Sequence, residues 1–356
     1  MSEPRFRWGI IGPGNIAKAF RDGLRDSRHG VLAAVATRNP GRESLAADYP
    51  AVRVVEGYEA LLVDPEIDAV YIALPHTGHA RWAIEAARAG KHALVEKPLG
   101  VTAREADAIF AAHRAASTFV GEAFMYRLHP QVATLVELLV AGAIGEVRMI
   151  QSSFGFQMPS FIPEHRLFAA QLAGGGILDA GCYPVSMARL IAGAAVGKPF
   201  DDPVHVVGDA QLNAEGTDSW SAAVLTFASG VIAQVACGTM IRLDNVLRIH
   251  GSAGRIELPD FWFAGGNRDN SPGQIDIVRN GERETVRVGA SAHLYSYESD
   301  AVAEAVTAGR VEFASPGMSW ADSLGNARVL DAWRAQAGVV YPFERADSHP
   351  LETTAR

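Results

Sequence analysis

Short apolar runs alternate with longer amphipathic stretches along the first hundred residues. Four runs are apolar almost throughout and are bounded by Gly, Pro or charged residues: Arg7–Ile11, Val31–Ala36, Ala69–Leu74 and His92–Val95. Such runs are typical of strands buried on both faces, as in a parallel sheet. The stretches between them, such as Ile16–Arg21 and Ala80–Ala87, repeat apolar residues at helical spacing, and Gly90 follows the second as a C-cap. This alternation predicts a doubly wound α/β sheet.

After about residue 124 the pattern changes. A helix is expected from His129 to Val140, and strand-like segments then follow at 147–154, 204–212, 222–227, 231–237 and 246–250. Strands linked this closely predict an open, predominantly antiparallel sheet with helices on one side, and helical patterns at about 297–308 and 319–337 close this part. We therefore expect an α/β domain over residues 1–123, an α+β domain over 124–345 and a flexible tail over 346–356.

The composition excludes several classes of protein. The 356 residues suffice for two domains, and 48% hydrophobic with 20% charged residues is typical of a folded globular protein. Thirty-two basic against forty acidic residues give a net charge of −8, which opposes nucleic-acid phosphates. Cys182 and Cys237 are too few for a disulfide framework, and no apolar run reaches the length of a membrane span or a signal segment. We expect a cytoplasmic protein that binds neither nucleic acid nor membrane.

A glycine-rich turn follows the first predicted strand. Gly12–Ala17 reads G-P-G-N-I-A, which has the form G-x-G-x-x-A and runs into a helix. In a dinucleotide-binding turn the first glycine permits the tight bend, and the second lets the backbone approach a pyrophosphate. The small third residue lets helix and strand pack closely. The N–H groups at the start of the helix then face the phosphates. Strand, turn and helix together predict a dinucleotide site rather than a purely structural turn.

The residues after the second predicted strand indicate the cofactor. An NAD site usually places Asp or Glu there, against the ribose 2′-hydroxyl. This chain has Thr37 and Arg38 instead, with Arg42 close behind. A guanidinium beside a hydroxyl suits a 2′-phosphate, because arginine offers planar, charge-assisted hydrogen bonds. NADP is therefore expected in preference to NAD. The alternative is a solvated Arg38 in an enzyme that accepts both cofactors.

Two further segments carry groups suited to acid-base chemistry. Lys97, in Glu96–Pro98, follows the fourth predicted strand and so emerges at the carboxyl end of the sheet, where ligands bind in open α/β folds. The bond to Pro98 can be cis. Gly174–Gly176 predicts a mobile loop before a helix on which Asp179 and Tyr183, four apart, share one face. Tyrosine can exchange a proton if a cation lowers its pKa, and Lys97 is the candidate cation. Purely structural roles are the alternative for all three side chains.

Together these segments resemble the Gfo/Idh/MocA family of pyridine-nucleotide oxidoreductases. The resemblance spans nearly the whole chain, through Gly12–Ala17, Ile67–Pro75 with His79, Glu96–Pro98, Glu122–Arg127, Gly174–Tyr183 and Gly251–Ile256. It implies an α/β Rossmann domain followed by an α+β domain that packs through its sheet, hence a homodimer or a homotetramer. It also implies metal-free chemistry, with Lys97, Asp179 and Tyr183 in the catalytic positions.

The motifs and the resemblance together give a list of expected site residues. The cofactor-binding residues are Gly12, Pro13, Gly14, Asn15, Ile16, Thr37, Arg38, Leu74, His79, Glu96, Lys97 and Arg166. The substrate-binding residues are His76, Met125, Tyr126, Phe154, Asp179 and Tyr183. For Phe154, and for Phe156 two residues on, packing in a core or an interface is the favoured alternative.

Tyr183 indicates a branch of the family. Many inositol-dehydrogenase-like members have His at this position, whereas the branch with aldose dehydrogenases and dimeric dihydrodiol dehydrogenase has Tyr. His76 also resembles the dihydrodiol branch, although Met125 stands where an aromatic residue would suit an aromatic substrate. This branch implies NADP-dependent hydride transfer between nicotinamide and a carbinol or carbonyl carbon of an aldose or a cyclic trans-diol. Two alternatives are a non-catalytic NADP-binding regulatory protein and an enzyme that cleaves glycosides with the help of bound nicotinamide.

Overall fold

The chain folds into two compact units. The structure is a computed structural model of the 356-residue chain, and it describes residues 5–259, 261–263, 272–290 and 292–344. The first unit comprises residues 1–100, 104–128 and 291–323, and the second comprises 101–103, 129–290 and 324–356. The tail expected at 346–356 lies outside the described residues.

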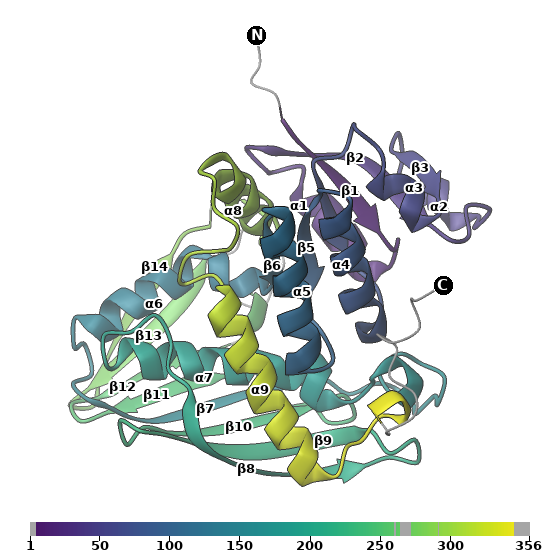
Figure 1. Ribbon diagram of the computed structural model, residues 1–356. Coiled ribbons are helices and arrows are strands. Elements are labelled where there is room, and N and C mark those ends of the chain that lie inside the picture. Colours follow the sequence, from purple (N-terminus) through teal and green to yellow (C-terminus); the bar gives the residue numbers. More distant parts are fainter. Residues whose placement is uncertain (1–4, 260, 264–271, 291, 345–356) are drawn as a thin grey trace. The chain divides into compact units, whose positions relative to one another are not determined.

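The first unit is built on a six-stranded parallel sheet with the strand order β3-β2-β1-β4-β5-β6 (Figure 1). Its strands are β1 (Phe6–Ile11), β2 (Gly30–Thr37), β3 (Arg53–Glu56), β4 (Ala69–Ile72), β5 (His92–Glu96) and β6 (Val120–Ala123). The strand order reverses between β1 and β4, as in doubly wound dinucleotide-binding folds. The four strands expected from apolar runs are confirmed, because a strand buried on both faces has no polar face.

Helices cover this sheet and bury one face each. They are α1 (Asn15–Gly23), α2 (Ser44–Asp48), α3 (Tyr58–Leu62), α4 (His79–Arg88), α5 (Ala103–Ala116) and α8 (Ser296–Thr307), with the short turns η1 (His76–Gly78) and η2 (Met125–Leu128). α1 buries Ala17, Phe20 and Gly23, which are spaced three residues apart and so lie on one side of the helix. Phe20 stacks on Tyr71 of β4 with ring centroids 4.0 Å apart.

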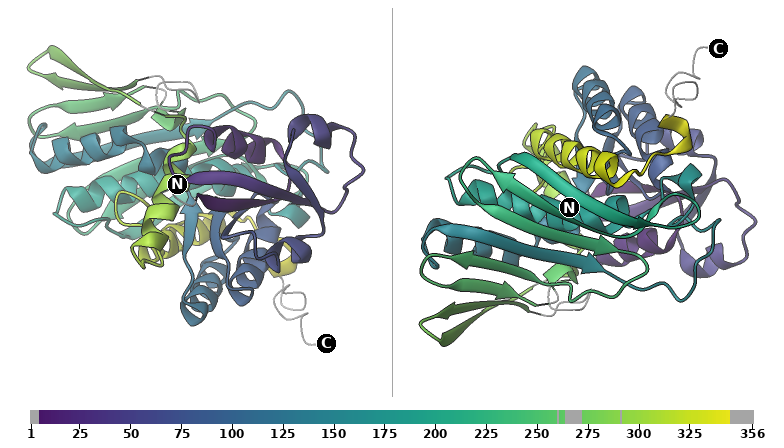
Figure 2. Two further views of the ribbon diagram at one scale, coloured as in Figure 1. Left: turned by 90° about the horizontal axis from the view of Figure 1, so that it is seen from above. Right: turned by 90° about the horizontal axis from the view of Figure 1, so that it is seen from below.

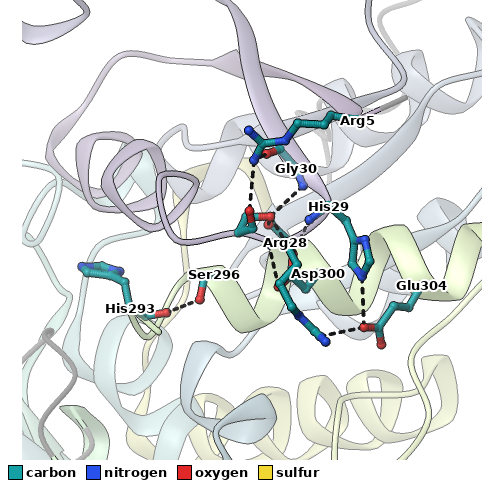
Figure 3. A network of polar contacts seen from close by, with 10 residues as sticks. Arg5, Arg28, His29, Gly30, His293, Ser296, Asp300 and Glu304 are labelled. Carbon is teal, nitrogen blue, oxygen red and sulfur yellow. Dashed lines mark hydrogen bonds and ion pairs between the residues drawn. The ribbon is translucent and has the colours of Figure 1, made fainter. Parts of the chain in front are cut away.

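The segment 291–323 belongs to the first unit, although the sequence pattern placed it in the second domain. Asp300 of α8 is buried and accepts hydrogen bonds from Ser27 Oγ at 2.6 Å and from the backbone N–H groups of Arg28 and His29 at 3.2 Å (Figure 3). Arg28 also donates to Glu304 at 2.8 Å. These contacts join α8 to the turn before β2 across more than 270 residues of sequence, a relationship that local patterning does not reveal.

The second unit is built on an eight-stranded sheet with the order β14-β13-β12-β11-β7-β10-β9-β8. Its strands are β7 (Val147–Gly155), β8 (Pro203–Leu212), β9 (Asp218–Phe227), β10 (Ile232–Gly238), β11 (Leu247–Gly251), β12 (Arg255–Leu258), β13 (Gly273–Arg279) and β14 (Glu282–Val288). Neighbouring strands are antiparallel except β7 and β10, which are parallel. The expected open, predominantly antiparallel sheet is confirmed.

Helices pack on one face of this sheet, and none of the helices that the structure describes in this unit covers the opposite, bare face (Figure 2, right). The helical elements are α6 (Pro130–Val140), η3 (Ala170–Leu172), the π-helical turn η4 (Ile177–Gly181), α7 (Cys182–Ala194), η5 (Phe261–Phe263), α9 (Trp320–Ala337, which begins in the first unit) and η6 (Pro342–Glu344). Every residue of α7 is buried, as expected of a helix without a polar face. On the bare face β9 exposes alternate residues, Trp220 and Val224 among them.

Candidate active site

The turn between β1 and α1 has the geometry of a phosphate-binding turn. Gly12 has a φ of +94°, and a Cβ there would lie 2.7 Å from the carbonyl oxygen of Ala73, so only glycine fits. A Cβ on Gly14 would meet nothing within 4 Å. Packing within the chain therefore does not require Gly14, and the space beside it can admit a pyrophosphate. α1 begins at Asn15 without a side-chain cap, which leaves its first N–H groups available to such a ligand.

The loop after β2 lies next to this turn. Thr37 ends β2, and its Oγ1 accepts a hydrogen bond from Asn39 N at 3.1 Å. The guanidinium of Arg38 is exposed and lies 5.9 Å from the centroid of the Tyr58 ring. Arg42 donates to the carbonyl of Pro13 at 3.4 Å and to Asp48 at 3.0 Å. Arg42 thus links the two loops.

His79 is fully buried and its ring spans two loops at the carboxyl edge of the sheet. Nδ1 lies 2.8 Å from the carbonyl oxygen of Pro98, and Nε2 lies 2.9 Å from that of Leu74. Burial, together with the neighbouring His76 and Lys97, lowers the pKa of His79 to about 3, so the ring is neutral and donates through one nitrogen. His79 fixes the loop after β4 against the segment after β5. Its expected contact with the cofactor stays a prediction.

Lys97 follows β5 at the edge of the sheet that carries the glycine turn. The register pairs Ile11 with Ile72, and Ile72 with Val95, so Gly12 and Lys97 leave the same edge on strands separated by β4. The peptide bond between Lys97 and Pro98 is cis. Glu96 is buried and accepts a hydrogen bond from Tyr71 Oη. Lys97 therefore follows directly on a residue, Glu96, whose side chain is fixed in the core.

In the second unit, Asp179 and Tyr183 lie on one continuous helical run. The run starts with the π-helical turn η4 and continues as α7. Turns of this rare type occur often at functional sites. Both residues are buried, each with 5% of its surface exposed. Arg166 Nη1 donates to Asp179 Oδ1 at 2.9 Å, so the structure brings together two residues that the sequence selected separately.

The glycine segment before this run is packed, whereas a mobile loop was expected. Gly174, Gly175 and Gly176 are all buried. A Cβ on Gly174 would lie 2.8 Å from the backbone N of Phe168, and Gly175 adopts a φ of +118°. Close approach of other parts of the chain and a positive φ therefore explain these glycines, and freedom of movement does not.

Aromatic side chains surround Tyr183. The ring centroids of Phe154 and Trp262 lie 4.8 Å and 5.5 Å from that of Tyr183, both in edge-to-face geometry. Trp262 Nε1 donates to the carbonyl of Ser153 at 2.8 Å, which fixes the indole. The sequence selected Phe154 but missed Trp262, which lies outside every recognised motif. The aromatic run Phe261–Phe263 was its one signal in the sequence.

The predicted substrate residues Met125 and Tyr126 lie in η2 of the first unit. Both are almost fully buried, at 2% and 1% exposure. Arg127, next to them, pairs with Asp322 at 2.7 Å and is itself fully buried. Burial raises the pKa of Glu122, just before this turn, to about 7, although Leu99 N donates to its carboxyl group at 2.9 Å. Action of Met125 and Tyr126 on one substrate with Tyr183 stays a prediction.

A cavity of about 1330 Å³ opens at the opposite edge of the parallel sheet, where the strands begin. Arg7 and Lys91 are among its lining residues. Arg7 pairs with Asp68 at 2.8 Å, and Lys91 Nζ donates to the carbonyl oxygens of Asp64 and Ile67, both at 2.7 Å. These cations hold nearby loops, and the cavity lies away from the edge that carries Gly12 and Lys97. It is not part of the candidate site.

The described parts of the chain offer neither a metal site nor a membrane-spanning helix. Among those residues, no group of three or more His, Cys, Asp and Glu side chains is arranged to hold a metal ion. In the same residues, no helix combines the length and the apolar character needed to cross a membrane.

Family models and relatives match the chain over most of its length. Residues 6–124 match the family described as an oxidoreductase family with an NAD-binding Rossmann fold, and residues 132–257 match the GFO/IDH/MocA C-terminal domain. The trans-1,2-dihydrobenzene-1,2-diol dehydrogenase of Mus musculus is 32% identical over 351 residues, which cover 95% of this chain and 99% of the relative. The D-xylose 1-dehydrogenase (NADP(+)) 2 of Haloferax volcanii is 34% identical over 329 residues, covering 91% and 95% respectively.

Solved structures show the same architecture. A 3-ketoreductase from Actinomadura kijaniata, in complex with NADP and TDP-benzene, superposes with a TM-score of 0.79 at 30% identity, covering 94% of this chain and 98% of the reductase. Structures of that reductase include variants in which a lysine or a tyrosine is replaced.

Proposed function

Because the chain belongs to the Gfo/Idh/MocA oxidoreductase family, we propose that it is an NADP-dependent dehydrogenase that acts on an aldose or a cyclic trans-diol. Hydride passes between nicotinamide C4 and a carbinol or carbonyl carbon of the substrate. One observation carries the proposal: the turn at Gly12 and the lysine at position 97 leave the same edge of the first unit's sheet. A phosphate-binding turn and a cationic group at one carboxyl edge suit a nicotinamide enzyme.

The proposed cofactor fits the residues at this edge. The space beside Gly14 and the uncapped start of α1 suit a pyrophosphate. Arg38, with the hydroxyl of Thr37 close by in sequence, suits a 2′-phosphate, and the first five residues after β2, Arg38 to Arg42, include no acid to repel it. NADP in a relative's name and NADP bound to the Actinomadura kijaniata reductase support this choice. When bound, the cofactor supplies the hydride acceptor for oxidation of the substrate.

The proposed proton chemistry belongs to side chains of the chain itself. In the oxidative direction Tyr183, as the phenolate, accepts the proton of the substrate hydroxyl on Oη, and Lys97 Nζ donates a hydrogen bond to the same substrate oxygen. Asp179 orients neighbouring hydroxyls of the substrate or the lysine. Arg166 fixes the direction of the Asp179 carboxylate through its 2.9 Å hydrogen bond. The proposal requires Lys97 and Tyr183 to reach one substrate oxygen.

The aromatic rings near Tyr183 form a buried apolar wall. Phe154 and Trp262 pack edge-to-face against Tyr183 and are 7% and 1% exposed. They shape the apolar surroundings of the proposed proton acceptor, and the substrate class is proposed from the relatives. The relatives that act on a trans-diol or on D-xylose support the two proposed substrate classes.

The bare face of the second unit's sheet is the proposed contact between subunits. Val207, Trp220, Val224 and Ile232 are 66%, 44%, 40% and 37% exposed on β8, β9 and β10, and a hollow of about 930 Å³ lies on the same strands. Exposed apolar surface of this kind favours a homodimer or a homotetramer. Cys182 and Cys237 are buried and are not joined in a disulfide, which suits a reducing compartment such as the cytoplasm.

A substrate screen tests the proposed function. The absorbance of reduced nicotinamide is followed with NADP and with NAD against aldoses, inositols and trans-dihydrodiols. Reduction of NADP by an aldose or a trans-diol supports the proposal. NADP binding without turnover of any substrate would indicate a regulatory protein. Release of sugar from a glycoside without net change in absorbance would indicate the glycoside-cleaving alternative.

A further inference from the structure

Asp218, the first residue of β9, places a carboxylate against the glycine segment that precedes η4. The residue is fully buried. Its Oδ2 accepts a hydrogen bond from the backbone N–H of Ile177 at 2.8 Å and another from Ser221 Oγ at 2.7 Å. Ile177 is the first residue of η4, so the carboxylate binds the start of the helical run that carries Asp179 and Tyr183.

The carboxylate of Asp218 lies so close to the two glycines before Ile177 that it leaves little room for a side chain at either position. A Cβ on Gly175 would lie 2.3 Å from Asp218 Oδ1, and a Cβ on Gly176 would lie 3.0 Å from Asp218 Oδ2. A larger residue at position 175 would therefore displace the carboxylate, besides being strained at a φ of +118°. Gly175 and Asp218 thus form one fitted pair, contributed by segments about forty residues apart.

Although Asp218 belongs to strand β9, its carboxylate caps the N-terminus of η4, as the side chain of an N-cap residue would. The N-terminal N–H groups of a helix lack partners within the helix, and η4 begins after Gly176, which has no side chain to cap it. A carboxylate at this end also interacts favourably with the helix dipole. Burial raises the pKa of Asp218, while the Ser221 hydroxyl and the backbone N–H groups of Ile177 and Gly176 oppose the rise.

Neighbouring side chains hold the same segment. Tyr341 Oη donates to the carbonyl of Gly174 at 2.7 Å, and Thr217 Oγ1 donates to the carbonyl of Phe168 at 2.9 Å. Asp179 lies two residues beyond the Asp218 contact at Ile177, and Tyr183 lies six beyond it on the same helical run. A displacement of Ile177 would therefore move both functional side chains together.

From these contacts we infer that Asp218 is a positioning residue that sets the placement of Asp179 and Tyr183 by holding the start of η4. The inference deepens the proposed dehydrogenase function, and its kinetic consequence rests on that function. Its structural consequence, an ordered start of η4, is independent of the proposed function.

The first experiment compares Asp218→Asn with Asp276→Asn in the full-length protein. Asp276 is a matched control, because it is also a buried acid of this sheet and accepts hydrogen bonds from Thr285 and Arg283, but it lies on β13. Asn at position 218 keeps one acceptor oxygen in place of Oδ2. It puts an NH₂ group in place of Oδ1, the oxygen that faces Gly175. We expect kcat to fall roughly 10- to 100-fold in Asp218→Asn, with the KM for NADP changed less than about twofold, because misplacement of about 1 Å has effects of this size.

The second experiment measures hydrogen exchange of the Ile177 amide and needs no catalysis. In the wild type this amide should exchange as slowly as those inside α7, although it lies at a helix start. Asp218→Ala, which removes the Oδ2 acceptor of the Ile177 amide, should remove the protection. Fast exchange of the Ile177 amide in the wild type would overturn the inference even if the variant does not fold. Wild-type kcat in Asp218→Asn, or an equal loss in Asp276→Asn, would also overturn it. A wild type that turns over no substrate would reject the proposed function, and exchange at Ile177 would then decide the inference alone.

Discussion

Arg166 Nη1 donates a hydrogen bond to Asp179 Oδ1 at 2.9 Å, and this contact fixes a buried carboxylate at the start of the helical run that carries Tyr183. The arginine side chain is 48% exposed, whereas that of the aspartate is 6% exposed. Solvent therefore reaches the pair from the arginine side. In the proposed mechanism the guanidinium orients the carboxylate that in turn orients the substrate.

Arg166→Ala should lower kcat about tenfold, because the Asp179 carboxylate loses the donor that fixes its direction. The midpoint of thermal unfolding should change little, since the arginine is half exposed. Steady-state kinetics and a thermal melt test both expectations. Arg148→Ala, at an exposed arginine of β7, is the control. Unchanged kcat in Arg166→Ala would show that the pair has no part in turnover.

Arg38→Ala should change the choice of cofactor. Loss of the guanidinium removes the proposed partner of the 2′-phosphate, so the KM for NADP should rise roughly 10- to 100-fold while the KM for NAD moves less than about threefold. Arg53→Ala, which removes an arginine of β3 that pairs with Asp64, is the matched control. Equal changes in both KM values would place Arg38 outside the 2′-phosphate site.

The two glycines of the first turn should respond differently to alanine. A Cβ at position 14 meets nothing within 4 Å, so Gly14→Ala should fold normally and lose affinity for NADP, because the methyl group occupies the proposed pyrophosphate space. A Cβ at position 12 would lie 2.7 Å from the Ala73 carbonyl oxygen, so Gly12→Ala should be less stable. Thermal melts and NADP titrations of both variants provide the measurement. Wild-type NADP affinity in Gly14→Ala would argue against a pyrophosphate at this turn.

Glu122 should make stability depend on pH. Burial raises its pKa in the folded state to about 7, so folding favours the protonated form. Its stabilising contribution is complete below the unfolded-state pKa of about 4.5 and is lost as the pH rises through about 7. The loss is on the order of 3 kcal/mol, and the raised pKa of Glu298 acts in the same direction.

Glu122→Gln should therefore flatten the fall in the free energy of unfolding between about pH 5 and pH 8, because the amide does not titrate. Urea unfolding across this range gives the slope, with Glu282→Gln at an exposed position of β14 as the control. A slope identical to that of the wild type would mean that Glu122 does not stay protonated in the folded protein.

Much of the first unit could be predicted from the sequence, because its strands are buried on both faces and leave uniform apolar runs. The glycine turn and Lys97 were located for a related reason: parallel strands bring their carboxyl ends to one edge. The assignment of α8 to this unit could not be predicted. It depends on Asp300 accepting hydrogen bonds from Ser27 and from the backbone after it, and neither residue belongs to a motif.

The second unit shows where residue patterns stop being informative. Gly174–Gly176 marked the right place, but the glycines are explained by close approach of the Phe168 backbone to Gly174 and of the Asp218 carboxylate to Gly175. Trp262 likewise contacts Tyr183 across 79 positions of sequence, in a turn without a motif. Such contacts depend on the tertiary structure, so the spacing of residues along the chain does not predict them.

The turnover of Lys97→Met tests the central claim most directly. We expect the variant to bind NADPH with nearly wild-type affinity, measured by fluorescence titration, and to lose at least ~100-fold in kcat, the scale expected when positioned acid-base help is removed. Lys198→Met, at an exposed lysine of the second unit, should keep wild-type turnover. Wild-type kcat in Lys97→Met would contradict the assignment of Lys97 as the group that polarises the reacting oxygen.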